Sequence, residues 1–391
     1  MTDPRPVRLG VVGLGRAFML MLPGLAAHPG FVLAAAADPN EEGRARFAAD
    51  YGARVFETDA EMCRDGDIDA VYIATPHQYH AANTRTAAAH GKHVLVEKPM
   101  ALTLADCQAM IDACRDAGVA LVVGHSHSFD APIERARALI AGGTLGAVRL
   151  VNSLNYTDFL YRPRRPEELD PNAGGGAIFN QAPHQIDVAR LLCGGLATSV
   201  RAVTGAWDPA RPVDAAFSAL LNFANGASAT LTYSGFAHFD SDELMGWVGE
   251  GGQDKHPARY GAARRLLHGA DEAALRRARR YGATVSPAPT VPPHHQHFGQ
   301  LIVSCEHADL RPLPDSIWIY GDGERRQERL PPPTLFRREV LDAFHQVATG
   351  GPPPIQTGAW GMATMEVCLA IVQSAREGRE IALTHQVGIP D

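Results

Sequence analysis

Short apolar runs alternate with helix-like stretches through the first third of the chain, and this alternation constrains the fold more than any other feature. Apolar runs at 7–12, 31–37, 70–74, 94–96 and 119–123 have the length and composition of buried strands. The stretches between them are typical of helices, and several close with a glycine. This alternation predicts an α/β fold, a doubly wound parallel sheet.

The first predicted strand runs directly into a glycine turn, Gly13-Leu14-Gly15, and a helical pattern follows. A dinucleotide fingerprint requires this context, because Gly13 permits the tight turn and Gly15 lets a pyrophosphate approach the backbone. The N–H groups at the start of the helix would bind that pyrophosphate. Phe18 stands where a third glycine is usual, so we expect the helix to sit further from the sheet or to tilt.

An acidic residue, Asp38, follows the second predicted strand. A carboxylate at this place accepts hydrogen bonds from the adenine ribose and repels a 2′-phosphate. No arginine lies immediately beside Asp38, so the sequence favours NAD over NADP. Alternatively, or in addition, Asp38 caps the helix that begins near Glu41 and Glu42.

Composition narrows the class of protein. The chain has 391 residues, of which 46% are hydrophobic and 20% charged, which suits a soluble globular protein of two or three domains. The net charge of -7 argues against a nucleic-acid partner. No signal-peptide pattern and no apolar run near the ~18 residues of a membrane helix occurs. Six scattered cysteines predict a reduced, cytoplasmic protein.

The fourth apolar run ends in Glu97-Lys98-Pro99. Ligands of an open parallel sheet bind beyond the carboxyl ends of the strands, so this pair is expected at the ligand edge. Lys98 could there donate a hydrogen bond or a proton to a substrate oxygen. A surface ion pair between Glu97 and Lys98 is the alternative.

The rest of the chain predicts an α+β domain with a largely antiparallel open sheet. Strand-like segments lie at 199–206, 215–223 and 227–233, and Asn225-Gly226 is a strong hairpin signal between the last two. We expect an NAD-binding Rossmann domain over 1–128 and a substrate-binding and oligomerisation domain over 129–391. Residues 249–298 look inserted, and two closing helices within about 336–378 are expected to cover the first domain.

A triple glycine at 174–176 is expected to open a helix that runs to about Cys193. On this helix Asn180, His184 and Asp187 would share a face, because their spacings are four and three. Glycines let the backbone come close to a ligand, so His184 is a candidate ligand-facing residue.

A loop rich in arginine and proline covers 161–166. Guanidinium groups bind carboxylates in a bidentate manner, so the loop predicts an anionic substrate. The alternative is a solvated loop whose arginines pair with the acidic residues that follow. The predicted substrate contacts are Tyr161, Arg162, Arg164, Arg165 and Gln181.

The predicted insertion carries a basic stretch around Arg276–Arg280 and a histidine cluster, His294, His295 and His297. A nucleic-acid patch is disfavoured because the arginines lack interleaved aromatic residues. The histidines lack a carboxylate at fixed spacing, so substrate contact or a polar loop is favoured over a metal site.

The motifs Gly13-x-Gly15, Ala74-Thr75-Pro76 with His80, and Glu97-Lys98-Pro99 occur in an order that resembles the glucose–fructose oxidoreductase/inositol dehydrogenase (Gfo/Idh/MocA) family. The resemblance covers the whole first domain. It implies that Lys98 lies near the nicotinamide and the substrate hydroxyl. The implied cofactor contacts are Gly13, Gly15, Arg16, Ala17, Phe18, Asp38, Thr75, Pro76, His80, Glu97 and Lys98.

The triple glycine and the helix after it resemble the second motif of the same family, in which the histidine is the general acid/base. This implies that His184 is catalytic, with Lys98 converging on it from the other domain. The family most often has an aspartate four residues before this histidine, where the chain has Asn180, and an amide cannot take a proton. Asp187 would replace it only in part. The family also implies a homo-oligomer, a dimer or a tetramer.

Within the family, the stretches 161–168, 179–185 and 239–243 resemble the dehydrogenases of phthalate cis-4,5-dihydrodiols. This implies oxidation of a ring carbinol with aromatisation to a catechol, 4,5-dihydroxyphthalate. Three alternatives stay open: a sugar, inositol or polyol dehydrogenase, an NAD-retaining glycoside hydrolase, and a non-catalytic nucleotide sensor.

Overall fold

The computed structural model describes residues 5–64, 67–283 and 291–390. The chain divides into two compact units that exchange segments of sequence. The first unit takes Met1–His125, Ala273–Val291 and Thr334–Met365, and the second takes Ser126–Glu272, Pro292–Pro333 and Glu366–Asp391. Each unit is therefore assembled from three stretches, and the chain passes between the units five times.

The first unit holds a six-stranded parallel sheet in the order β3-β2-β1-β4-β5-β6. Its strands are β1 (Val7–Val12), β2 (Phe31–Ala37), β3 (Arg54–Phe56), β4 (Ala70–Ile73), β5 (His93–Val96) and β6 (Leu121–Val123). The strand order runs outward in both directions from the pair β1–β4, as in a doubly wound sheet. The prediction of a parallel Rossmann sheet is confirmed.

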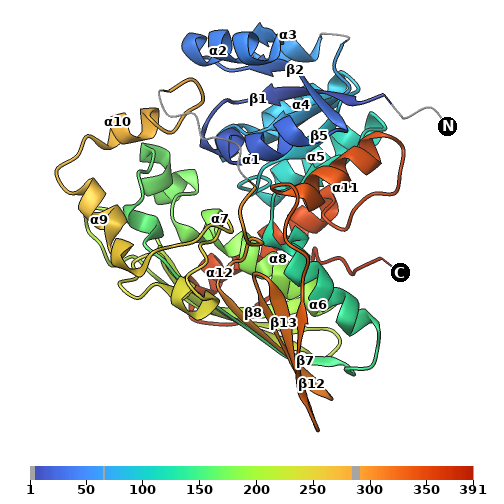
Figure 1. Cartoon of the computed structure of the whole chain (residues 1–391), viewed down its shortest axis with the longest axis vertical. Helices are drawn as coiled ribbons and strands as arrows, with labels where there is room; N and C mark the ends of the chain where they lie inside the picture. Colours follow the sequence, from blue (N-terminus) through green and yellow to red (C-terminus); the bar gives the residue numbers. More distant parts are fainter. Residues whose placement is uncertain (1–4, 65–66, 284–290, 391) are drawn as a thin grey trace. The chain divides into compact units, whose positions relative to one another are not determined.

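Helices connect these strands (Figure 1): α1 (Arg16–Ala27), α2 (Glu41–Tyr51), α3 (Asp59–Cys63), α4 (His80–Ala89) and α5 (Leu104–Asp116). Local signals set their ends. Asn40 caps α2 by accepting a hydrogen bond from the backbone of Gly43, at 2.6 Å, and Thr103 caps α5 in the same way. The helix cap in the Asp38 loop is therefore Asn40, and not Asp38.

Two later helices were expected to cover the first domain. Helix α11 (Arg338–Ala348) does pack on the first unit, where Phe344 stacks on Phe31 with ring centroids 6.0 Å apart. Helix α12 (Gly358–Glu377) differs from the expectation, because only its part up to Met365 belongs to the first unit. Beyond that point its residues belong to the second unit.

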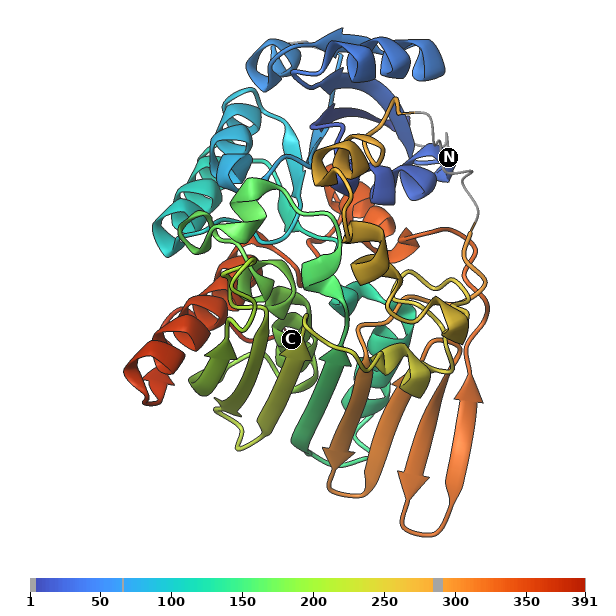
Figure 2. The same cartoon turned by 90° about the vertical axis from the view of Figure 1, so that its left-hand side faces the viewer.

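The second unit holds a nine-stranded sheet in the order β14-β13-β12-β11-β7-β10-β9-β8-β15. Figure 2 shows these strands side by side. Only β7 and β10 run parallel, and the other neighbours are antiparallel, so the predicted largely antiparallel sheet is confirmed. The strands are β7 (Val148–Tyr156), β8 (Ala197–Gly205), β9 (Ala216–Phe223), β10 (Ser228–Ser234), β11 (Gln300–Cys305), β12 (Ala308–Leu313), β13 (Ser316–Gly321), β14 (Arg325–Arg329) and β15 (Ile381–Ala382).

The continuous helix expected from the triple glycine to Cys193 is wrong. Two helices replace it, α7 (Ala177–Asn180) and α8 (Ala182–Leu192), with Gln181 between them at φ -124°. Pro183 explains the break, because a proline has no N–H to donate one turn back and its ring is tolerated only in the first turn of a helix. Helix α6 (Ala131–Ala141) precedes this sheet.

The predicted insertion, 249–298, carries two short helices, α9 (Ala262–Leu267) and α10 (Glu272–Arg277). The basic stretch is helical only up to Arg277. Residues 284–290 of the insertion lie outside the described residues. No helix among the described residues combines the length and the apolar character needed to cross a membrane.

Candidate active site

The glycine turn after β1 has the shape that a dinucleotide requires. Gly13 has φ +91°, and a Cβ there would lie 3.0 Å from the backbone of Ala74 and Thr75. At Gly15 a Cβ would meet no atom within 4 Å, so this face of the turn is open. Helix α1 follows at Arg16, and no side chain among the described residues caps its first turn. These residues fit the pyrophosphate of NAD.

Asp38 lies directly beside this turn. Its two carboxylate oxygens accept hydrogen bonds from the backbone N–H groups of Leu14 and Asn40, each at 2.7 Å. Each oxygen keeps a lone pair for a ribose hydroxyl. The guanidinium of Arg44 donates to the Asp38 carbonyl oxygen at 2.6 Å, so an arginine does stand in this loop, six residues along the chain.

Phe18, which replaces the third glycine, is fully buried in an aromatic cluster. Its ring lies 5.9 Å from Phe47 of α2 and 5.5 Å from Tyr281 of the insertion, between centroids. The expected tilt of α1 stays a prediction.

His80 contacts the segments that follow β4 and β5. Its Nδ1 lies 2.9 Å from the carbonyl oxygen of Pro99, and its Nε2 lies 3.0 Å from that of Thr75. Burial lowers the pKa of His80 to about 4, so its ring is neutral at pH 7 and its single N–H donates to only one of these two carbonyl oxygens. The buried ring thus lies between the turn at Thr75-Pro76 and the turn at Lys98-Pro99, which is a positioning role.

The alternative of a surface ion pair does not fit Glu97, which is buried. Glu97 accepts a hydrogen bond of 2.6 Å from the hydroxyl of Tyr72, and Arg337 lies 3.9 Å away. Burial raises the pKa of Glu97, against the opposing effect of Arg337. Lys98 follows at the end of β5, half-buried, at the sheet edge where the sequence predicts it.

In the second unit, His184 lies on α8 with only 5% of its surface exposed. Its ring contacts that of His127, 4.7 Å between centroids at an angle of 71°, and that of Phe298 at 4.8 Å. His127 in turn contacts Phe298 at 4.9 Å. Two rings thus pack against the predicted catalytic histidine, and sequence reasoning identified neither His127 nor Phe298.

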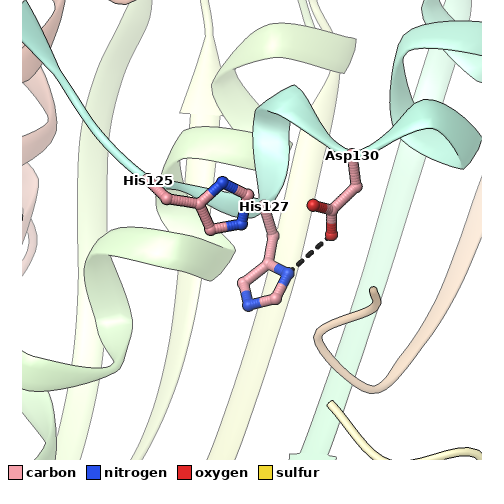
Figure 3. Close-up of side chains that lie close together, drawn as sticks. All are labelled: His125, His127 and Asp130. Atoms are coloured by element: carbon pink, nitrogen blue, oxygen red, sulfur yellow. Dashed lines mark hydrogen bonds and ion pairs between the residues drawn. The ribbon is translucent and has the colours of Figure 1, made fainter. Parts of the chain in front are cut away.

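His127 is held between two carboxylates. Its Nδ1 lies 2.6 Å from Asp130, the bond that Figure 3 draws as a dashed line, with His125 two residues before it. Its Nε2 lies 3.8 Å from Glu250. Burial alone would lower the pKa of His127, but Asp130 and Glu250 raise it to about 9. His127 is therefore a fixed, buried cation beside His184.

The other residues predicted on this helix are held by protein groups. Asn180 donates to the carbonyl oxygen of Gly176 at 2.8 Å, so its amide braces the glycine turn. Asp187 accepts a hydrogen bond of 2.5 Å from the hydroxyl of Ser128. Gln181 is half-buried at the break between the two helices.

The three arginines of the predicted substrate loop have different surroundings. Arg164 donates twice to the carbonyl oxygen of Phe159, pairs with Glu168 and stacks over the Phe159 ring at 3.6 Å, so its guanidinium is part of the protein framework. Arg165 pairs with Glu168 at 3.4 Å. Arg162, whose side chain is 36% exposed, lies 3.1 Å from Asp158 and 3.8 Å from Glu250.

The insertion fastens this loop. Arg264 stacks over Tyr161 at 3.9 Å, and Glu272 accepts a hydrogen bond of 2.5 Å from the backbone of Arg164. Although burial lowers it, the carboxylates of Glu250 and Asp158 raise the pKa of Arg162 above its ordinary value. Glu250 therefore lies close to two cations, Arg162 and His127, both at 3.8 Å.

A cavity of about 30 Å³ lies inside the second unit beside His127, lined also by Ser153, His297 and Phe298. Gln185 lines it too, and its buried Oε1 has no hydrogen-bond partner among the described residues. A space of this size holds about two water molecules.

The histidines at 294, 295 and 297 bind groups of other loops in the second unit. His294 lies between Asp315, at 2.6 Å, and Asp254, at 3.1 Å. His295 reaches the carbonyl oxygen of Pro331, and His297 reaches that of Val248. These contacts agree with the interpretation of the cluster as a polar loop.

Two family models match the chain. Residues 7–125 match an oxidoreductase family with an NAD-binding Rossmann fold, and residues 133–253 match the GFO/IDH/MocA C-terminal domain. One curated relative is 1-carboxy-3-chloro-3,4-dihydroxycyclohexa-1,5-diene dehydrogenase of Comamonas testosteroni. It is 47% identical over 378 residues, which are 95% of either chain.

Solved structures share the fold. A protein of Bordetella bronchiseptica RB50 described as a dehydrogenase has a TM-score of 0.91 and 43% identity, over 97% of this chain and 100% of its own. The WlbA dehydrogenase of Bordetella pertussis, solved with NADH and UDP-GlcNAcA, has a TM-score of 0.70 at 22% identity, over 98% and 99% of the two chains. With both halves matched and a relative of such identity along nearly its whole length, the chain belongs to the Gfo/Idh/MocA family of NAD-binding oxidoreductases.

Proposed function

We propose that this enzyme oxidises a ring carbinol of a carboxylated aromatic cis-dihydrodiol, with phthalate 4,5-dihydrodiol as the first candidate. The observation that carries the proposal is a pair of cations near the predicted base: His127 contacts the buried His184, and Arg162 shares the carboxylate of Glu250 with His127. Glu250, Asp130 and Asp158 already pair with these two cations, so a substrate carboxylate has to displace one of them, and the partly exposed Arg162 is the cation best placed to receive it. The Comamonas relative, whose named substrate also carries a carboxyl group on a dihydroxylated ring, supports the same class.

The predicted residues have distinct roles in this reaction. NAD, when bound, takes up the hydride. His184 accepts the proton of the hydroxyl as general base, a role that contributes about 10²–10⁴-fold to the rate. Lys98 donates a hydrogen bond to the oxygen that becomes a carbonyl. Asn180, whose amide is bonded to a backbone carbonyl, adds no charge to His184. Aromatisation of the product lowers its energy, so a weaker proton relay suffices.

The function is tested by following NADH formation at 340 nm with the purified protein. The substrates are phthalate cis-4,5-dihydrodiol, a monocarboxylated cis-dihydrodiol, uncarboxylated cis-dihydrodiols, and a panel of inositols and aldoses. We expect turnover of the carboxylated dihydrodiols. Turnover of the polyols alone would instead identify a polyol dehydrogenase of the same family. NAD retained by the protein without turnover of any substrate would favour a hydrolase or a sensor.

Arg162→Gln should weaken the use of carboxylated dihydrodiols. A hydrogen bond to a charged group contributes about 1.5–3 kcal/mol, so we expect kcat/KM to fall by roughly 10–150-fold. Uncarboxylated dihydrodiols should lose much less. Arg259→Gln is the control, because Arg259 is an exposed arginine of the same unit that lies outside the predicted substrate loop. Equal losses on both substrate classes would show that Arg162 does not bind the carboxylate.

Asp38→Ser should relax the preference for NAD. The change removes the carboxylate that repels a 2′-phosphate, and Arg44 already lies in the same loop. We expect the ratio of kcat/KM for NADP to that for NAD to rise at least about tenfold. Adding Arg44→Gln should reverse much of this gain. A ratio that stays constant in Asp38→Ser would show that this carboxylate does not select the cofactor.

We also propose a homo-oligomer, which the family implies, and a cytoplasmic location, which the cysteines imply. A homo-oligomer is supported by exposed apolar side chains on neighbouring strands of the second sheet, Val203 on β8 and Leu220 on β9. A cytoplasmic location is supported by six free cysteines, five of them buried.

A further inference from the structure

A segment of the insertion belongs to the first unit. We call residues 273–283 the strap. The chain enters the strap from the second unit after Glu272. The proposed reaction does not involve this segment. From the sequence, the only function considered for its basic residues is nucleic-acid binding, which is disfavoured.

Tyr281 anchors the strap beside the glycine turn. Its backbone N–H donates to the carbonyl oxygen of Leu14 at 3.2 Å. Its side chain is buried, with the ring at 5.5 Å from Phe18 and 5.9 Å from Phe47, between centroids. Its hydroxyl donates to Asp50 at 2.5 Å. One side chain thus contacts both α1 and α2.

Leu14, the middle residue of the turn, is consequently held from two sides. Its N–H donates to Asp38, the predicted ribose ligand, and its carbonyl oxygen accepts from Tyr281. The carboxylate of Asp50 also accepts a bifurcated hydrogen bond from Nε of Arg46, at 2.8 Å to each oxygen. The hydrogen bonds of Arg46 and Tyr281 lower the pKa of Asp50, so this acceptor stays charged.

The charge of the strap fits the same place. Four arginines, Arg276, Arg277, Arg279 and Arg280, directly precede the anchor. A dinucleotide brings a pyrophosphate to this turn, and nearby cations attract it even without direct contact.

We propose that Tyr281 is a positioning residue for the cofactor, and that the strap holds the Gly13–Gly15 turn in the shape that binds NAD. Cofactor binding and seating of the strap are then coupled, and each stabilises the other. This proposal concerns the cofactor alone, so it stands whatever the substrate of the enzyme is.

The test is a titration of the whole protein with NADH, followed by NADH fluorescence. Tyr281→Ala should raise the Kd at least about fivefold, the lower end of typical coupling between sites. Tyr281→Phe, which keeps the ring contacts and loses the bond to Asp50, should give a smaller rise. In turnover, KM for NAD should rise far more than kcat falls. Tyr260→Ala, an exposed tyrosine of the same insertion, is the control and should bind NADH normally.

Hydrogen exchange gives a second readout that does not depend on activity. NADH should slow the exchange of backbone amides in 273–283 as well as those of the turn. If Tyr281→Ala fails to fold, Tyr281→Phe and the exchange experiment decide. The proposal would be overturned if Tyr281→Phe left the Kd for NADH unchanged and NADH did not slow amide exchange in the strap. So would a folded Tyr281→Ala protein with the Kd of the wild type.

Discussion

His184→Gln is expected to lower kcat by about 10²–10⁴-fold, the contribution of a well-placed general base. The imidazole of His184 is buried against the rings of His127 and Phe298, so its position is fixed by packing. Glutamine retains a polar side chain of similar length but cannot accept a proton at neutral pH. The measurement is steady-state NADH formation with the substrate identified by the panel.

Binding of the cofactor provides the internal control. The predicted contacts with the dinucleotide, among them Gly13, Gly15 and Asp38, belong to the first unit, so the Kd for NADH should change far less than kcat. His268→Gln, an exposed histidine also in the second unit, should keep normal turnover. A His184→Gln enzyme that retains more than about a tenth of the wild-type kcat would exclude His184 as the general base.

Asp130→Asn is expected to destabilise the protein by about 3–5 kcal/mol at pH 6, because it removes the nearer of the two carboxylates that pair with the buried His127. His127 and Asp130 are 3% and 4% exposed, so solvent does not replace the lost interaction. The pair stabilises the fold because the pKa of His127 is raised to about 9, above the unfolded value of about 6.5.

The sign of the pH dependence follows from this shift. The folded state holds a proton that the unfolded state loses, so the stabilisation is complete below pH 6.5 and disappears as the pH rises through about 9. His80 acts in the opposite direction. Its pKa is lowered to about 4, so stability falls as the pH drops from 6.5 to about 4.

Chemical denaturation at a series of pH values measures both limbs. In the wild type these two groups predict a maximum of stability near pH 6.5. Asp130→Asn should flatten the alkaline limb and leave the acid limb, which depends on His80, unchanged. If the gap between wild type and variant is as large at pH 9.5 as at pH 6, charge on His127 is not the source of the stabilisation.

The sequence predicts the local features of this fold well. Alternating strands and helices, the glycine turn and the Asn225-Gly226 hairpin each depend on residues close together in the chain, and the structure confirms them. The single helix predicted after the triple glycine is wrong for an equally local reason, because Pro183 can lie only in the first turn of a helix. The division of α12 between the units depends on distant contacts, and periodicity cannot show it.

The surroundings of the site depend mostly on such distant contacts. Phe298 reaches His184 from more than a hundred residues along the chain, and no spacing rule indicates it. The pairing of His127 could have been predicted from the sequence. His-x-x-Asp shortly after a strand end is a pattern that pairs an imidazole with a carboxylate. For Arg164 the sequence shows the charge and does not show its partners. The guanidinium is already bound by the carbonyl oxygen and the ring of Phe159.

The chain crosses between the two units five times, and this has a consequence for protein synthesis. The six strands of the first unit emerge from the ribosome early, but the last segment of that unit ends only at Met365. At about 5–20 residues per second, the nascent Rossmann sheet waits tens of seconds for α11 and the start of α12 to cover it. During this interval its apolar surface is open, so chaperones that bind exposed hydrophobic segments should engage the nascent chain between the appearance of β6 and that of α12.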